Sequence, residues 1–414
     1  MPRLVSPYLP WLPNSSEMGQ QQSRPVFDAL LAKTHVQHAL IQPDGVHNDA
    51  PTALATLVFL RGTPDQLNAV YESESAELRT WAPSPLSITD EANKTRFLGD
   101  TRFQRAYMTY FSMEIAKFGG SSKALAMSHL LTGTKPLIYG LFAGLGRPLV
   151  FFSDAMELQT AIMVMQSLSL SAVDWADPIY EILTHPQLLM PAREVLSPEQ
   201  IIGRVTYDGR LSGVMKSGPG FHQVSHIFSN AVAKAAVLEY VHQLDCRDPA
   251  RLVEQLSSLS ALLLCATHKA GRPAFDFYLS CVPTWVNSLR VLLDSFNEER
   301  HRLVLIRGVW LLVVLCYITQ LRPVVDPSLL QCEALAQEDC SWESMHADFR
   351  QKGIFEGKYQ DQQLLRAVRS LWELGKRYDG DGTRYPKVAW KLITQWQGWT
   401  GLGADREESL NIRL

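Results

Sequence analysis

The side chains best suited to chemistry lie in three segments of this 414-residue chain, and the first two carry the candidate catalytic groups. The first segment begins with the imidazole of His47 and has the carboxylate of Asp49 two residues later. Either group can act as a general base beside a bound substrate. The second segment carries Arg147, whose permanent charge can polarise a carbonyl group or stabilise an oxyanion. We therefore predict His47, Asp49 and Arg147 as catalytic residues.

Arg147 shares its segment with two acidic residues, Asp154 and Glu157, and most of their neighbours are apolar. Burial of an unpaired charge is costly, so these groups are expected either to pair or to face a polar cavity. An internal salt bridge that ties helices together is one alternative, and a substrate-facing role is the other. The sequence leaves both open, and Asp154 is included among the predicted catalytic residues.

The third segment, residues 275–281, combines aromatic rings with a carboxylate and a thiol. The predicted substrate-binding residues are Phe151, Asp276, Tyr278, Cys281 and Trp310. Cys281 has no base near it in the sequence, which favours a packing role over that of a nucleophile.

Metal-binding spacings are scarce. His222 and His226 are four residues apart, so they share one face of a helix and could chelate a metal. No Glu follows His222, so the zinc-protease motif is absent, and a pair of ordinary helix histidines is the favoured interpretation. The six cysteines contain no CxxC pair. The residues themselves therefore predict no metal site and no cofactor.

The overall composition excludes several classes of protein. The net charge of −3 gives no basic field for nucleic acid or an anionic membrane. The longest apolar run, Leu303 to Ile318, is short for a membrane span and contains Arg307, so we expect a buried core helix. Residues 1–7 lack the apolar core of a secretory signal. We expect a cytoplasmic protein with no membrane or nucleic-acid partner; the sequence does not indicate its oligomeric state.

Helical periodicity dominates, which predicts an all-α fold: a large, single-domain, multi-helical bundle over residues 31–414. Residues 1–30 are rich in Pro, Ser and Gln, which predicts an extended N-terminal arm. Apolar residues from Phe221 to Leu238 recur every three or four positions, which predicts one helix. Thr63-Pro64 and Ser197-Pro198 are typical helix starts.

Four ordered segments resemble the fungal questin oxidase-like family. They are the Leu-Arg-Gly-Thr-Pro turn at 60–64 that follows His47, Leu-Phe-Ala-Gly at 141–144 leading to Glu157, Phe-Asp-Phe-Tyr-Leu at 275–279, and the helix end from Trp310 to Pro323. The resemblance implies an all-helical enzyme of fungal polyketide-type secondary metabolism. Known relatives oxidise or cleave anthraquinone-like rings, and some are described as non-haem iron oxygenases with several His and a modified Lys as ligands.

This chain departs from the family pattern at the ligand positions. Placed on the pattern, the expected histidines fall on Asp49, Thr52, Ala53, Arg147, Phe151 and Cys281, and the expected Lys falls on Val309. Only His47 remains, and one His cannot hold Fe(II), which needs at least two His and a carboxylate. The resemblance thus predicts a retained pocket without its metal ligands.

Three hypotheses follow. The first is a metal-independent tailoring enzyme that promotes a cyclisation, isomerisation, dehydration or pericyclic step on a hydrophobic small molecule by holding it in a reactive conformation. The second is an oxidoreductase, an oxygenase or Baeyer–Villiger-type enzyme that cleaves an anthraquinone-like ring, with iron as its cofactor or with oxygen attacking the substrate directly. The third is a non-catalytic ligand-binding protein of the same pathway. The first is the preferred hypothesis.

Overall fold

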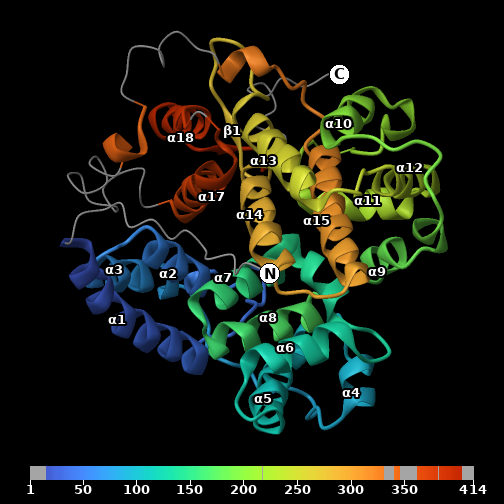
Figure 1. Ribbon diagram of the computed structural model, residues 1–414. Coiled ribbons are helices and arrows are strands. Elements are labelled where there is room, and N and C mark those ends of the chain that lie inside the picture. Colours follow the sequence, from blue (N-terminus) through green and yellow to red (C-terminus); the bar gives the residue numbers. More distant parts are fainter. Residues whose placement is uncertain (1–14, 217, 331–339, 346–360, 381, 403–414) are drawn as a thin grey trace, which may run out of the picture.

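The computed structural model describes residues 15–216, 218–330, 340–345, 361–380 and 382–402, and in these ranges helices dominate (Figure 1). The α-helices are α1 (Ser15–Gln37), α2 (Ala50–Phe59), α3 (Pro64–Ser75), α4 (Glu91–Arg96), α5 (Gln104–Glu114), α6 (Ser122–Leu131), α7 (Arg147–Leu158), α8 (Ala161–Val173), α9 (Asp177–Leu183), α10 (Pro198–Tyr207), α11 (Val224–Ser229), α12 (Ala231–His242), α13 (Pro249–Cys265), α14 (Val282–Leu293), α15 (Glu299–Thr319), α17 (Gln362–Tyr378) and α18 (Arg384–Gln395). Within the same ranges, strands β1 (Phe275–Asp276) and β2 (Trp399–Thr400) form a parallel pair. The all-α prediction is confirmed.

Helix α14 lies in the middle of the fold in Figure 1 and packs against α7, α13, α15 and α17. All of residues 282–289 are buried, including the large side chain of Trp285. A helix that is buried on every side must be surrounded by other helices, and this arrangement makes α14 the centre of the core.

Helix α15 explains the long apolar run. By length and composition it could cross a membrane, but 78% of its most apolar window is buried inside the fold. Residues 308–319 are all buried, and the indole nitrogen of Trp310 donates to the carbonyl of Tyr240 at 3.0 Å. Packing of α15 against α12 and α14 therefore accounts for its apolar character.

The two predicted capping signals mark the starts of helices. A third cap, which was not predicted, divides the stretch that was expected to form one helix. Thr63 and Ser197 each form a capping box, with Gln66 and Gln200 respectively, at the starts of α3 and α10. The stretch from Phe221 to Leu238 is not one helix as predicted, because it breaks at Asn230. The Asn230 side chain accepts from the first backbone amides of α12, and Asn is a preferred N-cap residue.

The N-terminal segment differs from the extended arm expected over residues 1–30. Residues 1–14 lie outside the described ranges. From Ser15 onwards the chain is helical, and α1 continues through the expected boundary to Gln37. Phe27 and Leu31 are buried, and α1 packs on α2 and α3. The Pro and Gln content suggested an extended chain, but these residues lie within a helix that contains Pro25.

A buried ion network fixes α17 against α7. The Arg369 guanidinium contacts the carboxylates of Asp154 at 2.7 Å and Glu157 at 2.5 Å. Arg369 and Asp154 are each 2% exposed, and the guanidinium lies 3.6 Å from the centre of the Phe59 ring of α2. Three helices thus meet at one cation.

Replacing Arg369 by Met should destabilise the fold strongly, because two carboxylates lose their buried partner. We expect a loss of about 3–5 kcal/mol in the free energy of unfolding, measured by denaturant titration. Lys376→Met, which removes an exposed pair with Glu373 on the same helix, should cost less than about 1 kcal/mol. Equal effects of the two substitutions would contradict a structural role for the network.

Candidate functional site

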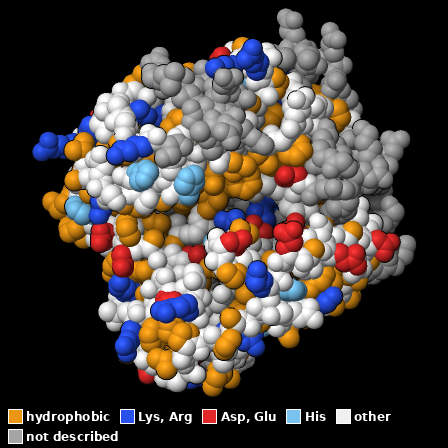
Figure 2. Space-filling model, turned by 180° about the vertical axis from the view of Figure 1, so that it is seen from behind, with side chains coloured by type: hydrophobic (Ala, Val, Ile, Leu, Met, Phe, Trp, Pro, Cys, Tyr) orange, Lys and Arg blue, Asp and Glu red, His pale blue; other side chains and the backbone are white. Residues whose placement is uncertain are grey.

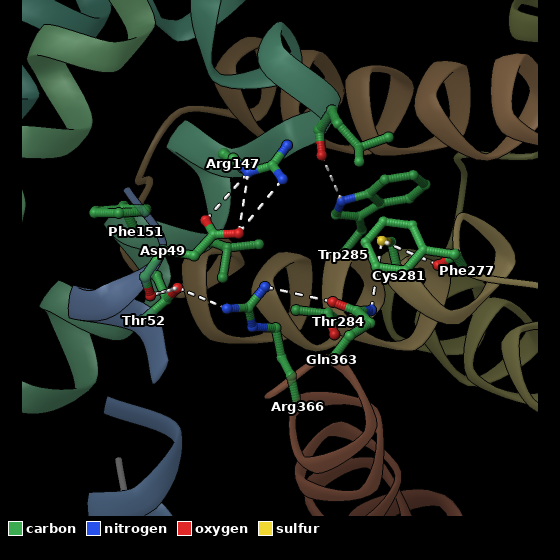
Figure 3. A pocket seen from close by; sticks show the side chains of 12 residues that line it. Asp49, Thr52, Arg147, Phe151, Phe277, Cys281, Thr284, Trp285, Gln363 and Arg366 are labelled. Carbon is green, nitrogen blue, oxygen red and sulfur yellow. Dashed lines mark hydrogen bonds and ion pairs between the residues drawn. The ribbon is translucent and has the colours of Figure 1, made fainter. Parts of the chain in front are cut away.

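A narrow pocket lies where four helices begin (Figure 3). Its lining residues are Asp49, Thr52, Leu145, Arg147, Val150, Phe151, Phe277, Cys281, Thr284, Trp285, Gln363 and Arg366. Most belong to the first turns of α2, α7, α14 and α17 or directly precede them. The cavity volume is about 30 Å³, which is room for roughly two water molecules. Figure 2 shows a central hollow on the rear face of the molecule, where basic and acidic side chains meet beside apolar ones.

The structure brings the three chemical segments of the sequence together at this pocket. Of the predicted site residues, Asp49, Arg147, Phe151 and Cys281 line it, and Thr52 lines it as well. All five stand at positions where the resemblance described in the sequence analysis led us to expect histidines. The ordered segments therefore do converge, as the retained-pocket prediction requires.

Asp49 and Arg147 form an ion pair at the pocket wall. The Nε atom of Arg147 donates to Oδ1 at 3.1 Å, and both Nε and Nη2 lie 3.4 Å from Oδ2. Burial raises the pKa of Asp49, but the guanidiniums of Arg147 and Arg366 outweigh it and hold the pKa below its usual value. Asp49 is therefore an anion at neutral pH and a weak proton acceptor, which argues against its predicted role as a base.

A strained loop sets the position of Arg147. Leu145 and Gly146 have positive φ angles of 58° and 67° directly before α7. The carbonyl of Leu145 accepts from the indole nitrogen of Trp285 at 3.1 Å. A Cβ atom at Gly146 would lie 2.8 Å from both Trp285 Nε1 and Leu312 Cδ1, so only glycine fits. The first residue of α7 is thereby held against the start of α14.

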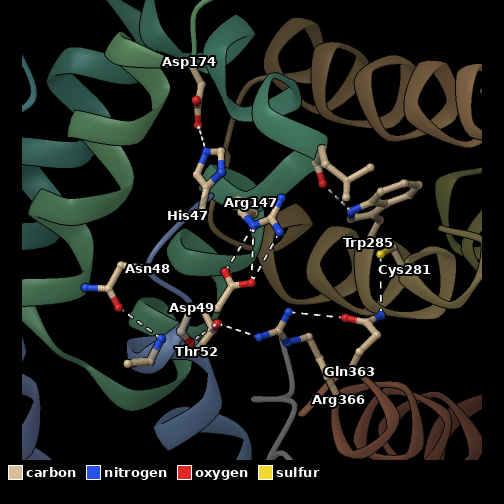
Figure 4. A network of polar contacts seen from close by, with 12 residues as sticks. His47, Asn48, Asp49, Thr52, Arg147, Asp174, Cys281, Trp285, Gln363 and Arg366 are labelled. Atoms are coloured by element: carbon tan, nitrogen blue, oxygen red, sulfur yellow. Dashed lines mark hydrogen bonds and ion pairs between the residues drawn. The ribbon is translucent and has the colours of Figure 1, made fainter. Parts of the chain in front are cut away.

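Arg366 enters the pocket from α17 and belongs to a chain of polar contacts. Its Nη2 donates to the Thr52 hydroxyl at 2.8 Å, and its Nη1 lies 3.4 Å from Oε1 of Gln363. The Gln363 amide in turn donates to the Ser280 hydroxyl at 2.8 Å and to the sulfur of Cys281 at 3.5 Å. These contacts join α2, α17 and the start of α14 around the cavity (Figure 4).

His47 lies behind the ion pair rather than on the pocket wall. Its Nε2 is 2.8 Å from Oδ2 of Asp174, and both side chains are nearly buried. Figure 4 shows the ring between Asp174 and the pair of Asp49 and Arg147. Gly144 makes room for this contact, because a Cβ atom there would lie 2.3 Å from the Asp174 carboxylate. A carboxylate fixes the tautomer of a bonded imidazole and leaves its other nitrogen free to accept a proton.

Cys281 lines the pocket as a neutral thiol. Burial raises its pKa to about 12, while the charge of Arg147 lowers it only in part. A thiol with this pKa supplies almost no thiolate at neutral pH. Cys281 therefore shapes the cavity, and a nucleophilic role is not supported.

Asp154 and Trp310, both predicted as site residues, are core residues that do not line the pocket. Asp154 is the buried partner of Arg369. Of the two alternatives left open by the sequence, the structure therefore favours the internal salt bridge over a catalytic role. Trp310 is fully buried in α15 and does not line the cavity. It lies at the start of the fully buried second half of α15, which explains why this aromatic residue is part of the core.

Asp276 and Tyr278 also do not line the pocket, although they adjoin it in sequence. Asp276 is fully buried, its Oδ1 accepts from the Leu279 amide at 2.8 Å, and the amide nitrogen of Gln320 can face its Oδ2 at 2.7 Å. The Tyr278 ring stacks with that of Phe221 at 6.1 Å. These contacts hold the loop between β1 and α14, so the two residues support the wall from behind.

The sequence matches the family model described as Questin oxidase-like over residues 46–371. The chain belongs to the questin oxidase-like family. All the pocket-lining residues fall inside the matched range. The chain is also similar to Oxidoreductase AflY of Aspergillus parasiticus, with 24% identity over 274 residues. That alignment covers 60% of this chain and 52% of AflY, so it spans about half the length of the relative.

The pocket does not suit the iron that some members of the questin oxidase-like family are described to hold. Its donors include one carboxylate, already paired with Arg147, and one neutral thiol. Arg147 and Arg366 add two positive charges that repel a dication. No group of three His, Cys, Asp or Glu side chains suited to a metal exists among the residues that the structure describes. Exposed His222 and His226 are not part of such a group.

Gln363, Arg366, Thr284 and Asp174 are site residues that sequence reasoning missed. The helix that carries Gln363 and Arg366 begins about 80 residues after Cys281, so no local pattern links it to the pocket. One signal in the sequence could have pointed to them. Arg366 and Arg369 are three residues apart, so they share one face of a helix.

Asp276 should make stability depend on pH. Burial raises its pKa to about 7 from an ordinary value of 3.8, so between these values the folded state holds a proton that the unfolded state has lost. Stability should therefore fall as pH rises from 5 to 7, by up to about 1.4 kcal/mol per pH unit from this group.

Urea titrations at pH 5, 6, 7 and 8 should show that decline in the wild type and a smaller one in Asp276→Asn. Exposed Asp44→Asn serves as the control and should keep the wild-type slope. If Asp276→Asn keeps the full slope, the carboxylate is not the responsible group.

Proposed function

We propose that the protein is a tailoring oxidoreductase of secondary metabolism that acts on a hydrophobic, polycyclic aromatic molecule. The observation that carries the proposal is the family match, because its range includes every residue of the pocket. The printed name of AflY, an oxidoreductase, supports the same class of reaction. Phe151, Phe277 and Trp285 supply aromatic walls suited to a fused ring. A whole ring needs more space than about 30 Å³, so its entry requires these walls to move apart.

In this proposal, Arg147 stabilises negative charge on a substrate oxygen. Its guanidinium is held by Asp49 and by the fixed start of α7, so little reorganisation accompanies the reaction. His47, oriented by Asp174, lies behind the ion pair (Figure 4), so the wall movement that admits the ring must also open a path to it. It then accepts the proton that the substrate loses when it becomes an enolate or phenolate. The aromatic walls exclude water from the charged oxygen, which strengthens its attraction to Arg147.

Dioxygen is the oxidant in the proposed reaction. The substrate C–H bond gives its proton to His47, and its electron pair forms a C–O bond with dioxygen. The peroxide anion then takes a proton, so the substrate R–H and dioxygen become R–OOH with no other reductant. Carbon is oxidised and dioxygen is reduced to the peroxide level; ring cleavage by rearrangement of the hydroperoxide is a later step.

A metal-independent cyclisation or isomerisation is the second candidate. The charge pattern of the pocket favours it, because an oxyanion site of Arg147 and a fixed cavity can promote such steps without any oxidant. The two candidates use the same residues but differ in their need for dioxygen.

Turnover of a panel of hydroxylated anthrones and anthraquinones under ¹⁸O₂ and under argon separates the candidates. We expect products that carry ¹⁸O by mass spectrometry and no conversion under argon. A product isomeric with its substrate that forms equally under argon would replace the oxidoreductase proposal by the cyclase. Binding of these compounds with no conversion in either atmosphere would support the ligand-binding hypothesis.

Arg147→Gln and His47→Gln should each reduce kcat by about 100-fold or more, because the first removes the oxyanion partner and the second the proton acceptor. The comparison is made by single-substrate kinetics with matched thermal-melting controls. Exposed His226→Gln should retain wild-type kcat. Full activity of both pocket variants would overturn the assigned roles.

A further inference from the structure

Arg366 is a cation in the pocket that makes no hydrogen bond to a carboxylate in the described part of the chain, although the charges of Asp49 and Glu74 lie close enough to act on it. Its two terminal nitrogens contact neutral groups, the Thr52 hydroxyl and the Gln363 carbonyl. Its Nε atom is buried and makes no hydrogen bond with the described residues. Buried guanidinium nitrogens are ordinarily hydrogen-bonded, so Arg366 keeps donor capacity that its neutral neighbours do not use. Its two terminal nitrogens are the ones directed toward the cavity (Figure 3).

The charges around the cavity leave a positive excess. Among the side chains that line the cavity, two guanidiniums, Arg147 and Arg366, face one carboxylate, Asp49. Among the described residues, that carboxylate is hydrogen-bonded only to Arg147. Asp174 also acts on Arg147, but it lies behind the wall and is bonded to His47. The remaining titratable lining group is the neutral thiol of Cys281. Glu74 of α3 lies close enough to interact with Asp49 and Arg366, and burial raises its pKa first and the charge of Asp49 raises it further. Glu74 therefore carries its negative charge less readily than a free glutamate.

The backbone adds to this excess. Residues in the first turns of α2, α7, α14 and α17 line the same cavity. The N-terminal end of a helix carries about half a positive charge from its unpaired amide groups. Four such ends at one cavity reinforce the field of the two guanidiniums. The whole arrangement attracts an anion and repels a cation.

The size of the cavity limits what can enter. About 30 Å³ accommodates a group of two or three heavy atoms, such as a carboxylate or a phenolate oxygen, and excludes a fused ring. The flanking side chains Phe151, Phe277 and Trp285 then face the part of the ligand that carries this group.

We infer that the pocket binds its aromatic ligand through an oxyanion, a carboxylate or phenolate group that enters between Arg147 and Arg366. Arg366 is the residue that recognises the charge, and Thr52 and Gln363 hold its guanidinium in place. The inference deepens the proposed function and rests on it for the identity of the reacting molecule, but binding itself needs no turnover. A ligand held as an anion is also more electron-rich, which favours its reaction with dioxygen.

The test compares anthraquinone-2-carboxylate with its neutral amide by calorimetric titration of the full chain at pH 7. The wild type should bind the carboxylate at least about tenfold more tightly, since charge-assisted hydrogen bonds to Arg are strong. Arg366→Gln should remove most of this preference, because the remaining guanidinium of Arg147 is paired with Asp49, and it should change the amide affinity far less. Arg366→Lys should keep part of it, and Arg377→Gln, an exposed arginine on the same helix, should keep all of it.

A second arm uses 2-hydroxyanthraquinone, whose ionisation is visible in its absorption. The bound ligand should ionise about one pH unit below the free ligand in the wild type and closer to the free value in Arg366→Gln. Equal affinity for carboxylate and amide together with an unshifted phenol would overturn the inference. If the protein prefers the anion but oxidises none of the compounds, the inference stands and the proposed function fails. If it oxidises neutral ligands and shows no preference for the anion, the proposed function stands and the inference fails.

Discussion

The Arg369 guanidinium is the contact on which the pocket depends. It lies one helical turn from Arg366 and holds α17 against Asp154 and Glu157 of α7. Because α17 follows α7 by more than 200 residues, nothing in the local chain brings their first turns together. The buried cation does so, and it places Arg366 opposite Arg147. A buried structural arginine and a pocket-lining arginine thus occupy the same face of one helix, and their neighbours determine their different surroundings.

Residues in short, ordered motifs were predictable from the sequence, and long-range partners were not. The three motif segments identified Asp49, Arg147, Phe151 and Cys281 because a family pattern fixes the order of its segments. Residue type alone could not separate Arg147 from Asp154, since both are charges within apolar sequence. Only the packing of α17 showed that Asp154 is neutralised inside the fold, whereas Arg147 borders a cavity.

The same limit applies to the fold. Capping boxes at Thr63 and Ser197 were visible because they depend on residues three apart. The break at Asn230 was missed because apolar periodicity continues through it, although Asn is itself a capping signal. Helix α1 was not predicted because the Pro, Ser and Gln content of residues 1–30 is typical of an extended arm, although Phe27 and Leu31 have helical spacing. Local chemistry therefore predicted helix starts better than it predicted helix ends or arms.

The convergence of four helix starts has a consequence for how the pocket can change. A field that originates in peptide groups is not titrated by pH and is not removed by exchanging a side chain. Histidines placed at the positions of Arg147 and Cys281 would stand in surroundings that still disfavour a bound cation. A metal site would therefore be hard to build here one residue at a time, because the field of the backbone would persist through each substitution.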